Sequence, residues 1–286
     1  MAQDARCAPT AADAAAERVP PPAVLPATLA GAVRVELRRA VRPPYETPGV
    51  VLVNGALMTA CWTLLPASVV GVVFRVHGPL AFAMVLACWM YADVPATNLL
   101  GADPARSLAA LPDPAALRRL WYARNIVLWL SVTPLCALVA VAIGVDEHRP
   151  VTTALTLAWI ATVPLGALGF AGWVGVWFPY HRLPLRHRWA ARRNWRPMLL
   201  RWIVLLLVPY GVVPVLTVVV ILPGLLLWLA VAAGDGRISD AHAAAGLALA
   251  VAVAAVAWPF GHRYGSRLAV RRRDRLAAFL SDPDRG

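Results

Sequence analysis

The ionisable residues of this chain match no common catalytic pattern. The sequence contains no HExxH, GxSxG or GxGxxG motif, and its four cysteines and six histidines show no metal-ligand spacing. All its basic residues other than histidine are arginine, which excludes a P-loop lysine, a Schiff-base lysine and a serine–lysine dyad. We therefore expect no catalytic residue, no metal site and no cofactor bound by this chain.

Asp93 is the only carboxylate inside a long apolar run. An ionisable residue within a membrane segment is a functional candidate by default. Asp93 lies near the end of its run, however, so a helix-end role or a pairing with Arg106 or Arg124 explains it equally well. The sequence leaves these alternatives open.

Mildly polar side chains within the apolar runs offer a weakly polar surface to an amphipathic substrate. The candidates for such a substrate path are Asn54, Thr59, Thr63, Ser131 and Thr133. In lipid, residues of these types usually form hydrogen bonds within or between helices, so packing is the simpler interpretation.

Glycines recur every three residues in one apolar run, at positions 166, 169, 172 and 175. This spacing leaves one narrow strip of the helix surface without side chains. It predicts close helix approach, either within the chain or between two copies.

Composition places these residues in a membrane. Of the 286 residues, 60% are apolar and 15% are charged, and the apolar residues form long uncharged runs. This pattern is typical of an all-α polytopic membrane protein. We assign the net charge of +12 to topology and to anionic membrane lipid, not to nucleic acid, because no aromatic and basic module accompanies it.

Six apolar runs predict six transmembrane helices. They cover residues 50–74, 79–100, 125–145, 151–180, 202–234 and 243–260. The fifth run is too long for one upright helix, and Pro209, Pro214 and Pro223 interrupt it. We expect one crossing followed by a re-entrant part.

The six spans belong to a membrane domain that covers residues 29–275. An Ala- and Pro-rich tail, residues 1–28, precedes it and is expected to be disordered, and a cytoplasmic tail, residues 276–286, follows it. With both termini and the two large loops inside, the outer turns contain only three arginines, Arg75, Arg149 and Arg237. Because cytoplasmic segments carry the excess of arginine, we expect both termini to be cytoplasmic.

A long polar segment, residues 97–124, separates the second and third spans. Asp103-Pro104 and Asp113-Pro114 each predict a helix start, because the Asp carboxylate caps free N–H groups and Pro fits the first turn. We expect two short amphipathic helices, broken at Pro112, on the membrane surface or against a partner.

A second amphipathic stretch, residues 29–42, precedes the first span. A helix here places five apolar residues on one arc and three arginines, at positions 34, 38 and 42, opposite; the apolar residues are Leu29, Val33, Leu37, Ala40 and Val41. This pattern predicts an interfacial helix. A solvated basic leader is the alternative.

Two short motifs accompany this layout, Ala96-Thr-Asn-Leu-Leu-Gly-Ala-Asp103 and Gly172-Trp-Val-Gly-Val-Trp-Phe-Pro179, the latter followed by His181-Arg182. Together with the interfacial helix, the spans and the polar segment, they resemble the permease subunits of type-2 ATP-binding-cassette exporters, especially actinobacterial ones. The second motif departs from the family pattern, because Gly172 and Gly175 stand where small polar residues are expected.

The resemblance implies a transport subunit, not an enzyme, in the bacterial plasma membrane. It implies a dimer with a second permease copy or paralogue, and coupling to a separate P-loop ATPase that binds ATP and Mg²⁺. The residues implied to contact the ATPase are Leu100, Gly101, Asp103, Leu108, Leu111, Pro112, Leu117, Arg118 and Arg119. In this arrangement the leucines at 108, 111 and 117 insert into a groove on the ATPase. A membrane scaffold or assembly factor, and a membrane-embedded enzyme without an ATPase partner, are the alternatives.

Overall fold

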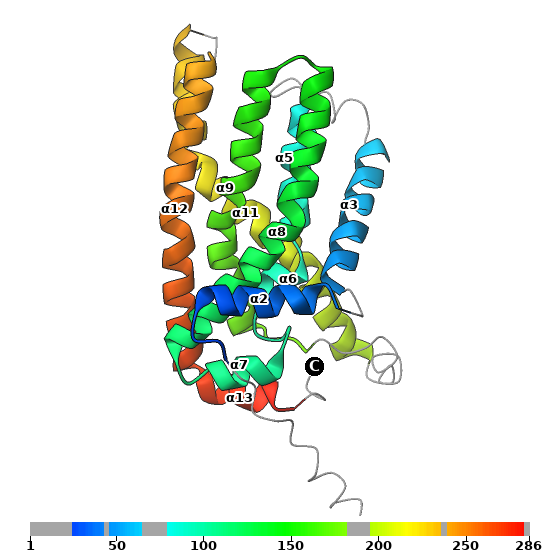
Figure 1. The fold of residues 1–286 in the computed structure, drawn as a ribbon, viewed down its shortest axis with the longest axis vertical. Helices are drawn as coiled ribbons and strands as arrows, with labels where there is room; N and C mark the ends of the chain where they lie inside the picture. The colour runs from blue at the N-terminus through cyan, green and yellow to red at the C-terminus, as the bar shows by residue number, and fades with distance from the viewer. Residues whose placement is uncertain (1–24, 43–45, 65–78, 182–194, 236–238, 283–286) are drawn as a thin grey trace, which may run out of the picture.

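Residues 25–42, 46–64, 79–181, 195–235 and 239–282 are described by the computed structural model, and this part of the chain forms helices and no strand. Long helices lie side by side along the long axis of the molecule, and consecutive ones alternate in direction (Figure 1). They bury one continuous apolar core between them.

Four of the described helices are long and apolar enough to cross a membrane. They are α8 (Pro114–Asp146), α9 (Pro150–Trp177), α11 (Trp195–Asp235) and α12 (Asp240–Arg271). Two further apolar helices, α3 (Glu46–Leu64) and α5 (Leu80–Tyr91), have shorter apolar stretches. By length and composition the chain is a membrane-embedded helical protein, while the count of six spans stays a prediction.

Three shorter helices lie together at one end of the bundle. They are α2 (Leu29–Ala40), α7 (Pro104–Ala110) and α13 (Arg273–Leu280). Figure 1 shows α2 lying across the long helices, with α7 and α13 beneath it. A second, smaller apolar core fills this end and includes Leu117 and Trp121 of α8 and Leu276 of α13. We call this region the polar end of the bundle, because the ion pairs described below lie there.

The glycine strip of α9 allows close approach within the chain. A Cβ atom on Gly166 would lie 2.9 Å from Cα of Ala254, and one on Gly169 would lie 2.8 Å from Cα of Trp258. Both contacts are with the backbone of α12, so no side chain fits between the two helices. The predicted close approach is confirmed, and at these positions the partner is α12, not a second copy.

The fifth apolar run is one uninterrupted helix, so the predicted re-entrant part is wrong. Helix α11 continues for 41 residues through three internal prolines. A proline removes one hydrogen bond, whereas a broken helix in lipid leaves many backbone groups unsatisfied, so continuing the helix costs less. A helix of this length extends about 60 Å, and Figure 1 shows it crossing the bundle obliquely.

The second apolar run ends earlier than predicted. Helix α5 ends at Tyr91, and a short helix, α6 (Val94–Thr97), follows it. The Asp93 carboxylate caps α6 by accepting a hydrogen bond from the backbone N–H of Val94 at 2.6 Å. The helix-end alternative for Asp93 is therefore confirmed, and the helix within the predicted span over 79–100 is interrupted at Asp93.

The C-terminal part of the chain adds helical structure at the polar end. Helix α12 continues to Arg271, eleven residues beyond the predicted end of the last span, and the first part of the expected C-terminal tail, 276–280, belongs to α13. Three predictions from the sequence lie at least partly outside the described residues: the disordered tail over 1–28, of which only 25–28 are described, the last ten residues of the first span, 65–74, and the large inside loop between the fourth and fifth spans, of which 182–194 are not described.

Candidate functional site

Both predicted helix starts in the polar segment are confirmed. The Asp103 carboxylate accepts a hydrogen bond from the backbone N–H of Arg106 at 3.2 Å, and Pro104 is the first residue of α7. The Asp113 carboxylate accepts from the N–H groups of Ala115 at 2.8 Å and Ala116 at 3.1 Å. The second helix is not short, however. It is the beginning of α8, which continues without a break into the third apolar run.

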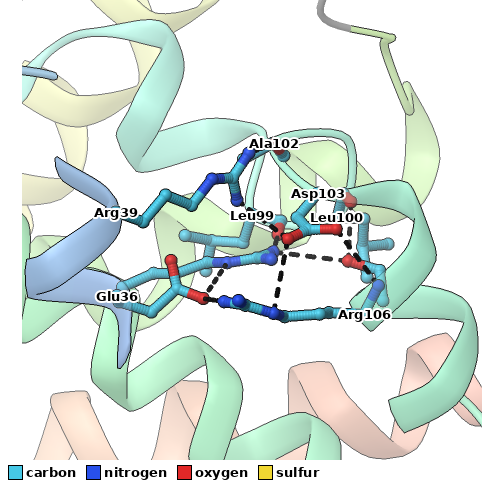
Figure 2. A network of polar contacts seen from close by, with 9 residues as sticks. Glu36, Arg39, Leu99, Leu100, Ala102, Asp103 and Arg106 are labelled. Carbon is cyan, nitrogen blue, oxygen red and sulfur yellow. Dashed lines mark hydrogen bonds and ion pairs between the residues drawn. The ribbon is translucent and has the colours of Figure 1, made fainter. Parts of the chain in front are cut away.

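A cluster of five charged residues joins α2 to this segment. Glu36 Oε1 accepts a hydrogen bond from Arg106 Nη1 at 2.9 Å and lies 3.8 Å from Arg124 Nε. Asp103 Oδ2 accepts from Arg39 Nη1 at 3.1 Å and lies 3.5 Å from Arg106 Nε. Figure 2 shows the side chains from α2 and the polar segment pointing toward one another. Three arginines and two carboxylates leave the cluster with one net positive charge.

Arg124 anchors the cluster to the long helices. Its side chain is only 7% exposed, and Nη1 donates to the backbone oxygen of Leu99 and, at 3.3 Å, to Ser107 Oγ. Ser107 Oγ in turn donates to the backbone oxygen of Leu100 at 2.7 Å. One buried guanidinium therefore ties α8 to the turn before α7, to α7 itself and, through Glu36, to α2.

The side of helix α2 that faces the bundle is rotated away from the apolar arc predicted from its sequence. Its buried residues are Ala32, Glu36 and Ala40, spaced four apart, while Leu37 and Val41 are exposed. Glu36 sets this orientation, because its carboxylate reaches the arginines of α7 and α8. The signal in the sequence is a single acidic residue between two alanines at four-residue spacing, which sequence reasoning missed.

Several residues implied to contact an ATPase lie inside this chain's own core. Leu100, Leu111 and Leu117 are at most 2% exposed and pack in the smaller core, which also holds Leu276 and Leu280 of α13. In this arrangement of the chain Leu111 and Leu117 are not accessible to a partner, and the contact with an ATPase stays a prediction. Their burial follows from the packing of several helices around this core, to which α8, α9, α12 and α13 all contribute side chains.

The other implied contact residues are more accessible. Leu108, Asp103, Arg118 and Arg119 are partly buried, Pro112 is exposed, and Gly101 is buried. A Cβ atom on Gly101 would collide with the backbone oxygen of Tyr180. The exposed residues of the polar segment form its outward surface; they are Ala105, Ala109, Pro112, Asp113 and Pro114. We call these five residues the outer face of the polar segment.

The candidate substrate-path residues hydrogen-bond within the protein. The hydroxyl groups of Thr59, Thr63 and Ser131 donate to carbonyl oxygens of their own helices at 2.8–2.9 Å. Two others join neighbouring helices. Tyr210 donates to Asn54 Oδ1 at 2.6 Å, between α11 and α3, and the Thr133 and Tyr91 hydroxyl groups lie 2.6 Å apart, between α8 and α5. These hydrogen bonds within and between helices are those that the packing interpretation predicts, and a substrate path stays a prediction.

A buried polar junction that sequence reasoning missed joins α8, α9 and α12. Asn125 Nδ2 donates to the backbone oxygen of Leu168 at 3.1 Å and lies 2.9 Å from His262 Nε2. His262 Nδ1 lies 2.8 Å from the backbone oxygen of Trp258, and its ring stacks on Tyr122 with centroids 4.2 Å apart. The bond to a carbonyl assigns the proton to Nδ1, so Nε2 accepts from Asn125. This junction joins three long helices next to the charged cluster along α8, because Asn125 directly follows Arg124.

Within the described ranges, no group of three or more His, Cys, Asp or Glu residues is arranged to hold a metal ion. The chain matches no known protein-family model, no curated protein and no solved structure. Its function is therefore argued from the geometry of the polar end.

Proposed function

We propose that this chain is the permease subunit of a type-2 ATP-binding-cassette exporter. In this proposal α3, α5, α8, α9, α11 and α12 are its six crossings, two permease copies or paralogues form the substrate path, and a separate P-loop ATPase docks on the outer face of the polar segment. The observation that carries the proposal is that ion pairs of Glu36 and Arg39 join α2 to Asp103 and Arg106 and to Arg124 of α8, while Arg124 donates a hydrogen bond to Ser107 of α7.

The geometry suits the transmission of a mechanical step. Ala105 and Ala109 lie four residues apart on the exposed side of α7, so they form a flat contact for a partner surface. The opposite side of α7 is tied through Arg106 to α2 and through Ser107 to Arg124 of α8. A displacement of α7 is thus delivered to α2 and α8 together. ATP bound between the partner subunits is the ligand that distinguishes the two states.

The placement of the chain ends supports the proposed topology. Helices α2 and α13 lie at the same end of the bundle (Figure 1), which requires an even number of crossings between them. The excess of arginine in the segments at this end favours its location in the cytoplasm. An ATPase that hydrolyses cytoplasmic ATP then meets the polar segment on the correct side of the membrane.

Two other functions make different predictions. A membrane-embedded enzyme requires acidic or histidine side chains free to act at one face, whereas Glu36 and Asp103, the two carboxylates of the charged cluster, are paired with arginines. A scaffold or assembly factor predicts that no ATPase contacts the outer face. The transported compound is not part of the proposal.

The test is purification of the tagged full chain in mild detergent from its native host, with mass spectrometry and an ATPase assay on the eluate. We expect a stoichiometric P-loop ATPase. Ala109→Asp, which puts a charge on the outer face, should lose it. Ala278→Asp is the matched control, because Ala278 is also an exposed alanine at the polar end, on α13. A lone chain without ATPase activity, from a folded sample, would support the scaffold or enzyme alternatives instead.

A further inference from the structure

The last three turns of α12 present an exposed stripe that the proposed function does not use. We call it the α12 stripe; its residues are Phe260, Arg263, Tyr264, Arg267 and Arg271. Their spacing of three and four residues places them on one side of the helix. The opposite side, which includes Gly261, His262, Gly265, Ser266 and Ala269, is buried. The stripe therefore points away from the bundle, toward the surrounding medium.

The side chains of the stripe change from apolar to charged along the helix. The ring centroids of Phe260 and Tyr264 lie 4.2 Å apart, and the Arg267 guanidinium lies 5.8 Å from the centre of the Tyr264 ring. An apolar ring, an amphipathic ring and a guanidinium thus follow one another over about 10 Å of helix. Bilayers change in the same order over a similar depth, from acyl chains to the headgroup, and interfacial aromatic residues occupy the boundary.

The arginines of the stripe have no carboxylate partner in the described ranges. Helix α12 contains no acidic residue after Asp240, and the next one along the chain, Asp274, lies 3.5 Å from Arg273 of α13. Arg263, Arg267 and Arg271 form no ion pair among the described residues. Three uncompensated guanidinium groups at the level of a membrane interface call for an anionic ligand, and phosphate oxygens fit the donor fork of arginine.

We propose that the α12 stripe binds the headgroup of an anionic phospholipid in the leaflet at the polar end. The guanidinium groups of Arg267 and Arg271 hold the phosphodiester, and Phe260 and Tyr264 lie along the start of the acyl chains. The stripe's charge and its aromatic-to-arginine order both favour a lipid over a soluble anion. This inference does not depend on what the chain transports.

The test is native mass spectrometry of the full chain in detergent, titrated with phosphatidylglycerol or with phosphatidylcholine. We expect the chain to retain phosphatidylglycerol more tightly. R267Q/R271Q should weaken that binding about thirtyfold, since each arginine near the interface contributes about 1 kcal/mol. R273Q/R275Q is the matched control, because it removes the same charge from exposed residues of α13 only a few positions away. This control should keep the preference.

Further outcomes decide the interpretation. R267K/R271K keeps the positive charge and should keep most of the preference, which provides a second test if the glutamine variant proves unstable. Excess inorganic phosphate should not displace the lipid. Equal weakening by both glutamine variants would reduce the effect to net charge and overturn the proposal. No preference for phosphatidylglycerol in the unaltered chain, or displacement by inorganic phosphate, would overturn it as well.

Discussion

Glu36 of α2 accepts a hydrogen bond from Arg106 of α7 at 2.9 Å, although 70 residues separate them in the chain. The same oxygen of Glu36 lies 3.8 Å from Arg124 Nε of α8. One carboxylate therefore sits between two arginines on two different helices. This arrangement makes the interfacial helix, the polar segment and the third apolar run a single mechanical unit.

Glu36→Gln should destabilise the polar end by about 3 kcal/mol, because it leaves the buried Arg124 and the half-buried Arg106 short of negative charge. Arg39→Gln should cost less than about 1 kcal/mol, since the Arg39 side chain is 40% exposed and water screens its ion pair. Denaturant unfolding in mild detergent measures both. Equal losses for the two variants would contradict the role assigned to Glu36.

A double-mutant cycle should show that Glu36 and Arg106 act together. We expect the effects of Glu36→Gln and Arg106→Gln on the free energy of unfolding to differ from additivity by about 1–3 kcal/mol in the double variant, as groups in one network do. The matched pair is Glu36 with Arg149, an exposed arginine at the opposite end, whose effects should add. Additivity in both cycles would show that the contact between Glu36 and Arg106 contributes no measurable interaction energy.

Gly169→Ala should loosen the packing of α9 on α12. The added Cβ would lie 2.8 Å from the backbone of Ala257 and Trp258, where no flexible side chain can move aside. We expect a loss of about 1–3 kcal/mol in the free energy of unfolding. Gly211→Ala is the control, because a Cβ there meets nothing within 4 Å; it should be neutral or slightly stabilising.

Leu117→Ala should reduce the free energy of unfolding by about 2–5 kcal/mol even without any partner, because Leu117 is fully buried in the smaller core. Leu138→Ala is the comparison, since that side chain is 68% exposed on α8 and should change stability little. Unchanged unfolding of Leu117→Ala, together with loss of a bound protein, would show instead that Leu117 faces a partner. Aspartate substitutions at Leu111 and Leu117 therefore test folding, and Ala109 is the better position to test docking.

Local interactions were predictable from the sequence. Asp103 and Asp113 cap helices because the carboxylate, the following proline and the free N–H groups lie within three residues of one another. The glycine strip of α9 gave close helix approach, since the absence of side chains is a property of the strip itself. The membrane class followed from composition, because 20-residue apolar runs have few other stable environments.

The three prolines at 209, 214 and 223 are local signals for a helix break, but α11 continues through them because a break in lipid leaves backbone groups unsatisfied. The orientation of α2 likewise differs from its local pattern. Its apolar arc is a local pattern, whereas Glu36 forms ion pairs with arginines 70 and 88 positions further along the chain.

The sequence by itself determined that this chain is helical, that it is embedded in a membrane and where helices begin in the polar segment. Each of these depends on neighbours along the chain or on overall composition. Only the tertiary structure decided which leucines are buried in the smaller core, which side of α2 faces the bundle and which residues form the outer face. Those properties depend on contacts between distant segments, and their energies exist only once the helices have packed.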